Sequence, residues 1–185
     1  MLNLQDSALF RTENYIDGQW VSGGVRHVLV HNPANGEVIA KVTDGDAHDA
    51  TAAVEAAAKA FKTWSRIPAQ QRATLIRLWF DLIMANADDL GALMTAEQGK
   101  PLAEAIGEIK YGASFIEYYA EECKRVKGAT IPTIANDRRL QTRKQAVGVV
   151  GCITPWNFPS AMIARKAGPA IARSEEHTSE LQSHV

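Results

Sequence analysis

Short apolar runs separated by turn residues fill the first forty positions and predict two β-hairpins. The runs at residues 15–16 and 19–21 flank Asp17-Gly18, a pair typical of two-residue hairpin turns. A second pair of runs, at 28–30 and 37–40, flanks a stretch that is rich in turn residues. Because isolated hairpins are only marginally stable in water, we expect another layer of structure to cover them.

Beyond the hairpins, apolar residues recur at the three- and four-residue spacing of amphipathic helices. Asp46 can cap a first, alanine-rich helix, which is predicted over residues 47–61. Small side chains on one face predict that this helix packs closely against another backbone. That face consists of Ala50, Val54, Ala57 and Phe61.

Three more helices are predicted before residue 128. The second begins near Pro68, and the third spans residues 87–98 and ends at Gly99. Pro101 opens a long fourth helix that reaches about Val126. The apolar positions of the second helix are Leu75, Leu78, Trp79, Leu82 and Ile83.

The pattern of the last part differs. Turn formers over residues 130–137 predict a connection, and the alternation over 138–145 predicts a strand with at least one wet face. The continuous apolar run 146–153 predicts a strand buried on both faces, and a short helix follows from Pro159. Strand, loop and helix form the first half of a βαβ unit, which places a ligand site in the loop 154–158.

Composition and charge narrow the possible functions. The 185 residues carry 20 Lys and Arg against 21 Asp and Glu, so no electrostatic case exists for a nucleic-acid partner. No apolar run approaches the roughly 18–20 residues of a membrane helix. The first fifteen residues lack the features of a secretory signal. Two cysteines are too few for a disulfide framework, and we expect a cytoplasmic protein.

Residues 173–185 follow without turn chemistry to introduce them. They read RSEEHTSELQSHV, with three acidic residues, one basic residue and two of the five histidines. A solvated acidic tail is the ordinary interpretation of such a run. This run also resembles, residue for residue, the conceptual translation of a common sequencing adapter. We therefore expect residues 173–185 to be a non-native tail.

The most informative stretch for chemistry is ITPWNFP, at residues 153–159. Two prolines stiffen the backbone around Trp156 and Asn157, and a predicted helix N-terminus follows directly. A rigid carboxamide beside a helix start can donate hydrogen bonds to an oxyanion or a phosphate. The alternative is a proline-braced turn in which Asn157 caps the helix and Trp156 belongs to the core.

ITPWNFP, followed by SAMIARKAGPA, closely resembles the aldehyde dehydrogenase superfamily. The resemblance extends back through DDLGALMTAEQGKPLAEAIGEIKYGASFIEYYAEE and GATIP to NPANGEVI and YIDGQW, and covers nearly all of residues 9–172 in family order. Within the superfamily, EQGKPLAEA, SFIEYYAEE and the IxRKAGPA pattern look most like the succinate-semialdehyde dehydrogenases.

The resemblance implies an α/β fold of which this chain is an incomplete N-terminal part. Residues 1–137 would form the N-terminal part of the cofactor-binding domain, from β-hairpins and helices. Residues 138–146 would be a bridging strand of an oligomerisation sheet, with an ordinary surface strand as the alternative. Residues 147–172 would be the first βα unit of a Rossmann-like NAD(P)-binding domain. A homo-oligomer is expected for the full-length protein.

The resemblance also implies the chemistry. In this superfamily a cysteine thiolate attacks the aldehyde, hydride passes to NAD or NADP, and water releases the acyl group with a glutamate as base. The motif match gives Asn157 the role of holding the oxyanion. The nicotinamide side of the cofactor site is expected to be lined by Ile153, Thr154, Pro155, Trp156 and Asn157.

Arg165 is implied to bind the distal carboxylate of succinate semialdehyde, since a guanidinium can hold a carboxylate through two parallel hydrogen bonds. The alternative is a solvent-facing helix arginine beside Lys166. The sequence departs from the subfamily at Ala164, where Thr is usual. The implied reaction is the oxidation of succinate semialdehyde to succinate in 4-aminobutyrate degradation. Glutarate semialdehyde, an uncharged aldehyde, and a non-catalytic fragment acting in assembly are the alternatives.

Other reactive residue types are expected to be structural or solvated. Neither Cys123 nor Cys152 lies in the GQxC context of the family nucleophile, and no ELGG segment carries the general base, so we expect an inactive fragment. Lys100 is not a Walker lysine, because no GxxxxGK motif contains it. The histidines show no metal spacing, and no metal is expected. Three acidic residues recur at helical spacing and are expected on solvated faces: Glu97, Glu104 and Glu108.

Overall fold

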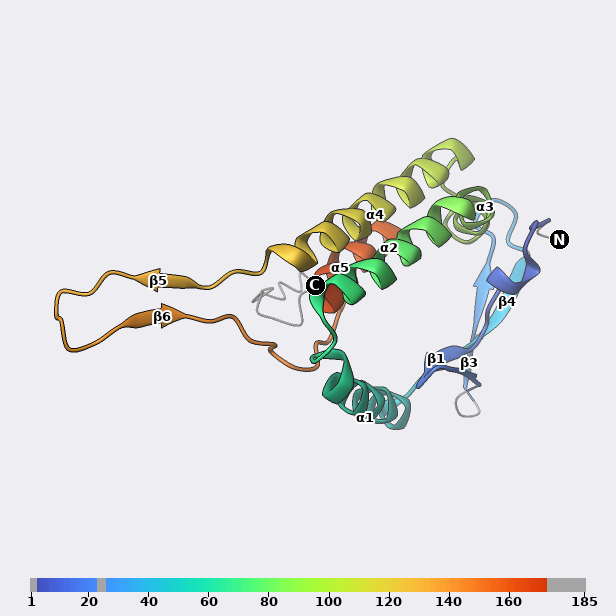
Figure 1. The fold of residues 1–185 in the computed structure, drawn as a ribbon. Coiled ribbons are helices and arrows are strands. Elements are labelled where there is room, and N and C mark those ends of the chain that lie inside the picture. The colour runs from blue at the N-terminus through green and yellow to red at the C-terminus, as the bar shows by residue number, and fades with distance from the viewer. Residues whose placement is uncertain (1–2, 23–25, 173–185) are drawn as a thin grey trace.

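Both predicted hairpins form in the N-terminal part of the computed structural model, which describes residues 3–22 and 26–172 (Figure 1). Strands β1 (Asn14–Ile16) and β2 (Gln19–Val21) pair antiparallel around Asp17 and Gly18. The φ angles of these two residues, 50° and 80°, are both positive, as a tight turn between twisted strands requires. Strands β3 (His27–His31) and β4 (Val38–Thr43) form the second antiparallel pair.

Helix α1 (Ala47–Trp64) begins where it was predicted. Asp46 accepts hydrogen bonds from the amides of His48 and Asp49, and the carboxylate of Asp49 accepts from the amide of Asp46, which completes a capping box. These backbone hydrogen bonds lower the pKa of the Asp46 carboxyl. The predicted close packing of α1 is wrong, because none of its residues is buried. Ala57 and Phe61 of its apolar face instead line an open cleft.

Four helices build the interior: α2 (Ala69–Ala85), α3 (Ala87–Gln98), α4 (Leu102–Glu122) and α5 (Pro159–Ala172). Helix α4 contacts the other three, and α5 lies alongside it (Figure 1). Helix α3 has the predicted bounds and ends at Gly99, whose φ of 76° is the left-handed conformation common after helices. Helix α4 ends four residues earlier than predicted, and a 3-10 turn, Cys123–Arg125, follows it.

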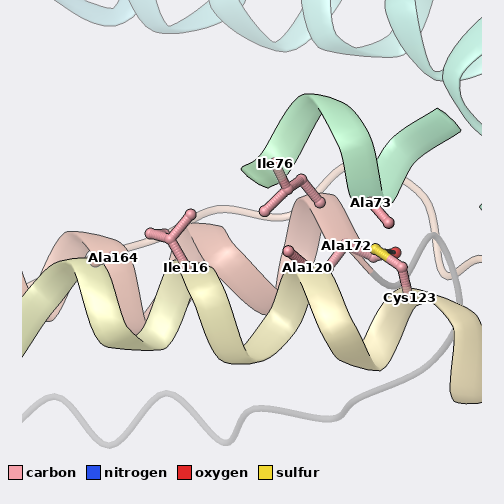
Figure 2. Close-up of a cluster of buried hydrophobic side chains, with 7 residues drawn as sticks. All are labelled: Ala73, Ile76, Ile116, Ala120, Cys123, Ala164 and Ala172. Atoms are coloured by element: carbon pink, nitrogen blue, oxygen red, sulfur yellow. Dashed lines mark hydrogen bonds between the residues drawn. The ribbon is translucent and has the colours of Figure 1, made fainter. Parts of the chain in front are cut away.

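Small side chains let these helices approach closely. One cluster joins α2, α4, the following turn and α5, and is shown in Figure 2: Ala73, Ile76, Ile116, Ala120, Cys123, Ala164 and Ala172. A second cluster joins α3 and α4: Ala87, Met94, Ala105 and Ile109. The helices α4 and α5 meet at Gly112, where an added Cβ would lie 3.2 Å from the Cα of Ala161. This contact sets the start of α5 directly against α4.

The predicted strands of the last part form only partly. Strands β5 (Ala129–Ile131) and β6 (Leu140–Thr142) pair into a hairpin that extends away from the helices (Figure 1). The predicted connection 130–137 therefore begins inside β5, and the predicted strand 138–145 is reduced to three residues. The prediction of a buried strand over 146–153 is wrong. A strand needs a hydrogen-bonding partner, and no described strand pairs with this segment, which is irregular.

The predicted non-native tail, residues 173–185, lies outside the described residues. Within the ranges 3–22 and 26–172, no helix combines the length and the apolar character that crossing a membrane would require.

Candidate functional site

The start of α5 is capped by a carboxylate from another helix. The amide of Met162 donates to the carbonyl of Phe158 at 2.9 Å, which leaves the amides of Ser160 and Ala161 without an acceptor inside α5. Glu108 of α4 accepts both through Oε1, at 3.0 and 3.3 Å. A cap side chain usually fills this role, and negative charge is favourable at a helix N-terminus.

The prediction that Glu108 lies on a solvated face is therefore wrong, since the residue is only 4% exposed. Glu97 and Glu104 are exposed, as predicted. Glu108 lies on the buried stripe of α4, three residues after Ala105 and four before Gly112. That position within the apolar stripe is the sequence signal that could have identified it.

Lys100 links this cap to the loop before α5. Its ammonium forms an ion pair with Oε2 of Glu108, and both side chains are largely buried. The Nζ atom also donates to the carbonyl oxygen of Asn157 at 3.3 Å and lies 4.5 Å from the ring centroid of Phe158. The contact over the ring is a cation–π interaction. One lysine therefore contacts the cap and two consecutive loop residues.

Gln98 holds the preceding residue of the loop, because its Nε2 donates to the carbonyl oxygen of Trp156 at 3.0 Å. The side chain of Trp156 itself is 82% exposed. The alternative in which Asn157 caps α5 and Trp156 lies in the core is thus excluded, since Glu108 is the cap. Sequence reasoning missed Gln98, Lys100 and Glu108 as residues of this site.

The predicted cofactor-facing residues, 153–157, lie together on an open surface. Ile153 is 70% exposed, and the exposed indole of Trp156 follows two residues after Thr154. An apolar, solvent-facing surface with an indole fits a flat aromatic ring such as nicotinamide. The N-terminus of α5 does not fit a phosphate, because Glu108 already occupies the amides of Ser160 and Ala161.

Arg165 lies exposed on α5, beside a cavity of about 130 Å³. Its guanidinium carbon is 5.8 Å from the ring centroid of Phe115. The other lining residues are Tyr111, Phe158, Ala161 and Met162. Phe158, one of these lining residues, directly follows the predicted oxyanion residue Asn157 in the sequence. Aromatic walls with one cation suit a small molecule that has a short apolar chain and an anionic end.

The two cysteines have different surroundings. Cys123 is 1% exposed, and its Sγ donates to the carbonyl oxygen of Ala172 at 3.2 Å. Burial raises the pKa of the Cys123 thiol, as suits a structural residue. Cys152 is exposed in the irregular segment 146–153, so the prediction that it lies inside a buried strand is wrong.

One group of potential metal ligands occurs within residues 3–22 and 26–172. One ligand atom from each of Asp46, His48 and Asp49 lies within 4.8 Å of the others. Both carboxylates belong to the capping box of α1, and their hydrogen bonds account for the cluster. We assign no metal to it.

Known proteins of one family match the sequence. The sequence model of the aldehyde dehydrogenase family matches residues 20–174. A mitochondrial succinate-semialdehyde dehydrogenase of Arabidopsis thaliana is 54% identical over 170 residues, which are 91% of this chain and 32% of that protein. A glutarate-semialdehyde dehydrogenase of Pseudomonas aeruginosa is 52% identical over 172 residues, 92% of this chain and 36% of that protein. An Escherichia coli succinate-semialdehyde dehydrogenase named for NADP+ is also 52% identical over 172 residues, which are 92% of this chain and 36% of that protein.

Solved structures agree with these sequence matches. An aldehyde dehydrogenase from Brucella melitensis biovar abortus 2308 superposes with a TM-score of 0.92 at 50% identity, covering 94% of this chain and 36% of that one. A betaine aldehyde dehydrogenase from Staphylococcus aureus, solved with NAD+, has a TM-score of 0.85 at 32% identity, covering 91% and 34%. The chain thus spans about a third of the length of these proteins. The predicted α/β fold class, as an N-terminal part of this fold, is confirmed.

Proposed function

The chain belongs to the aldehyde dehydrogenase family, and we propose that it is part of an enzyme that oxidises succinate semialdehyde to succinate. Among the relatives described above, one is named for NADP+ and another was solved with NAD+. The observation that carries the proposal is the place of Arg165, at a small aromatic cavity that is also lined by Phe158, the residue after Asn157.

Asn157 is proposed to hold the oxyanion. When a nucleophile adds to an aldehyde carbon, the carbonyl oxygen takes up negative charge, and a neutral amide N–H stabilises that charge without a pKa of its own to adjust. The backbone carbonyl of Asn157 accepts from Lys100, so the carboxamide is carried on a restrained backbone. A bound NAD+ or NADP+ would accept the hydride, and residues 153–157 would line its nicotinamide side.

The nucleophile and the general base are proposed to belong to the remaining part of the full-length enzyme. The 185 residues contain neither GQxC nor ELGG. Without a thiolate aimed at the aldehyde, the thioester step cannot start. We therefore expect no aldehyde-dependent NAD(P)H production from the 185-residue chain.

The distal carboxylate of the substrate is proposed to bind Arg165, whose planar guanidinium matches a carboxylate in geometry. Glutarate semialdehyde is the second candidate, because a glutarate-semialdehyde dehydrogenase is 52% identical to the chain. The two substrates differ by one methylene, which contributes only about 0.8 kcal/mol of binding. Both carry the anionic group that Arg165 would recognise.

The outer parts of the chain are proposed to serve assembly. Residues 138–146 would bridge to a second subunit in a homo-oligomer, because the β5–β6 hairpin extends from the helices with unpaired edges in the described chain (Figure 1). Residues 1–137 and 147–172 would both belong to the cofactor-binding domain.

The exposed free thiol of Cys152 suits a reducing compartment, and a cytoplasmic location is proposed on that ground.

The substrate proposal is tested in the full-length enzyme. Arg165→Ala should raise KM for succinate semialdehyde about 10- to 100-fold, as expected for losing a hydrogen bond to a charged group. KM for butanal, which has no carboxylate, should stay unchanged. The neighbouring variant Lys166→Ala is the matched control and should leave both values unchanged. Equal effects of Arg165→Ala on both aldehydes would contradict the carboxylate role.

A further inference from the structure

We propose that Gln98, Lys100 and Glu108 are positioning residues that together fix the backbone on both sides of Asn157. The proposal rests on the proposed function for one point only, the role of the Asn157 carboxamide as oxyanion donor. None of the three residues lines the cavity beside Arg165. They act through the backbone of residues 156–161.

Side-chain packing within the described chain restrains this loop only weakly. Trp156 is mostly in solvent, and Asn157 and Phe158 are exposed as well. The proline rings of Pro155 and Pro159 restrict one dihedral each. The intervening residues keep their own φ and ψ freedom. Within the described chain, polar contacts from other elements are therefore the main restraint on the loop.

Those contacts are placed at successive points of the backbone. Gln98 donates to the carbonyl of Trp156, and Lys100 donates to the carbonyl of Asn157. Glu108 accepts from the amides of Ser160 and Ala161 just beyond. With the peptide groups on both sides restrained, the carboxamide of Asn157 retains only its side-chain rotations. Misplacement of a catalytic group by about 1 Å can lower a rate about 100-fold, so this restraint has a functional consequence.

The three residues also support one another. Lys100 pairs with Glu108 in a largely buried ion pair, so the loop contact and the helix cap share one charge network. Gln98 and Lys100 flank Gly99, whose left-handed conformation turns the chain between α3 and α4. A Cβ at Gly99 would lie 2.8 Å from Cγ of Pro33, so the turn is also closely packed. Both loop contacts therefore come from a rigid turn.

A purely structural explanation accounts less well for the polar groups. Buried ion pairs contribute little net stability, and well-packed apolar residues of similar volume often replace them without loss. An apolar pair at positions 100 and 108 could seal the contact between α4 and α5 but could not hold a carbonyl and two amides of the loop segment. The geometry of the bonds thus points to positioning.

The first test measures amide hydrogen exchange by NMR in the 185-residue chain. Glu108→Ala removes the acceptor and should accelerate exchange of the Ser160 and Ala161 amides about tenfold or more relative to the amides in the buried middle of α4. Glu104→Ala, which changes an exposed glutamate one turn earlier on α4, is the matched control and should change neither. Equal protection of Ser160 and Ala161 in the two variants would overturn the proposed role of Glu108.

The second test follows the side-chain amide resonances of Asn157. Gln98→Ala and Lys100→Met should each shift and broaden these resonances while the resonances of the α2–α4 core stay in place. Lys110→Met, at an exposed lysine of α4, controls for the loss of one positive charge. Unchanged Asn157 resonances in both variants would overturn the proposal. If Glu108→Ala accelerates exchange throughout the chain, the result for Gln98→Ala decides, because the hydrogen bond of Gln98 lies at the surface.

A kinetic readout in the full-length enzyme separates positioning from stability. Gln98→Ala should lower kcat about tenfold with KM unchanged, and Gln98→Glu, which cannot donate from that position when ionised, should not restore it. Full kcat in Gln98→Ala would overturn the proposal. If Asn157→Ala kept full activity, the oxyanion role would fail, while the exchange and resonance results would still decide whether the loop is held as described.

Discussion

Each end of α5 is capped by a buried charge from another helix, but the two charges contact different parts of the chain. At the N-terminus, the carboxylate of Glu108 accepts from Ser160 and Ala161. At the C-terminus, the guanidinium of Arg72 donates to the carbonyl of Ala172 at 3.3 Å. The negative group lies at the positive end of the helix dipole and the positive group at its negative end, so both are favourable.

The two capping side chains, Arg72 and Glu108, differ in the other groups that they contact. Arg72 donates its second hydrogen bond to the carbonyl of Ile67, and Cys123 shares the carbonyl of Ala172 (Figure 2). These contacts stay within the helical core. Glu108 pairs instead with Lys100, which reaches the exposed loop. The same helix is thus anchored at one end for packing, and at the other end it carries the segment proposed for chemistry.

Removing the carboxylate at the N-terminal end should have the largest effect on stability. Glu108→Ala leaves Lys100 without its partner and two amides without an acceptor, and breaking a buried ion pair in this way costs about 3–5 kcal/mol. Urea unfolding followed by far-UV circular dichroism would measure the loss. Glu104→Ala, on the exposed face of α4, should change the free energy of unfolding by less than about 0.5 kcal/mol. A similar, small loss in both variants would contradict a buried cap.

Removing the charge at the C-terminal end should cost less. Arg72→Met keeps much of the side-chain volume and removes the hydrogen bonds to two carbonyls, for which about 1–3 kcal/mol is expected. No opposite charge is left unpaired, which is why the loss should be smaller than for Glu108→Ala. Activity of the full-length enzyme should fall only in proportion to the folded fraction. A greater loss of stability than in Glu108→Ala would reverse the contrast between the two ends.

The thiol at the C-terminal end should show the smallest effect, and it depends on pH. Because the pKa of Cys123 is raised in the folded chain, its contribution to stability is complete below the pKa of the unfolded thiol. The contribution is lost as pH rises above that value. The difference in urea midpoint between the native chain and Cys123→Ala should therefore shrink between about pH 7 and about pH 10. A difference that grows with pH would show the opposite shift.

The sequence predicted correctly those turns and helix ends that are stabilised by residues close to them in the sequence. The turn at Asp17-Gly18, the cap at Asp46 and the end of α3 at Gly99 all depend on residues close in sequence, and the structure has each of them. The apolar run 146–153 predicts a strand, but a strand forms only where another strand can pair with it. No described strand pairs with this run.

The residues of the candidate site show the same contrast between local signals and contacts that are distant in the sequence. Asn157 and Arg165 were named from a contiguous motif, and their roles remain predictions. The residues that hold the loop could not be found by spacing, because Gln98 and Lys100 contact a segment 58 and 57 residues away. Glu108 was misjudged because acidic residues at helical spacing usually face solvent. Its neighbours Ala105 and Gly112 already placed it on the buried stripe of α4.

The most direct test of the account is the turnover of Asn157→Ala in the full-length enzyme with succinate semialdehyde and NAD+ or NADP+. Loss of one oxyanion donor should lower kcat about 10²- to 10³-fold. The thermal unfolding midpoint should stay unchanged, because the side chain of Asn157 is exposed. A kcat equal to that of the native enzyme would contradict the central claim that the loop before α5 carries the oxyanion site.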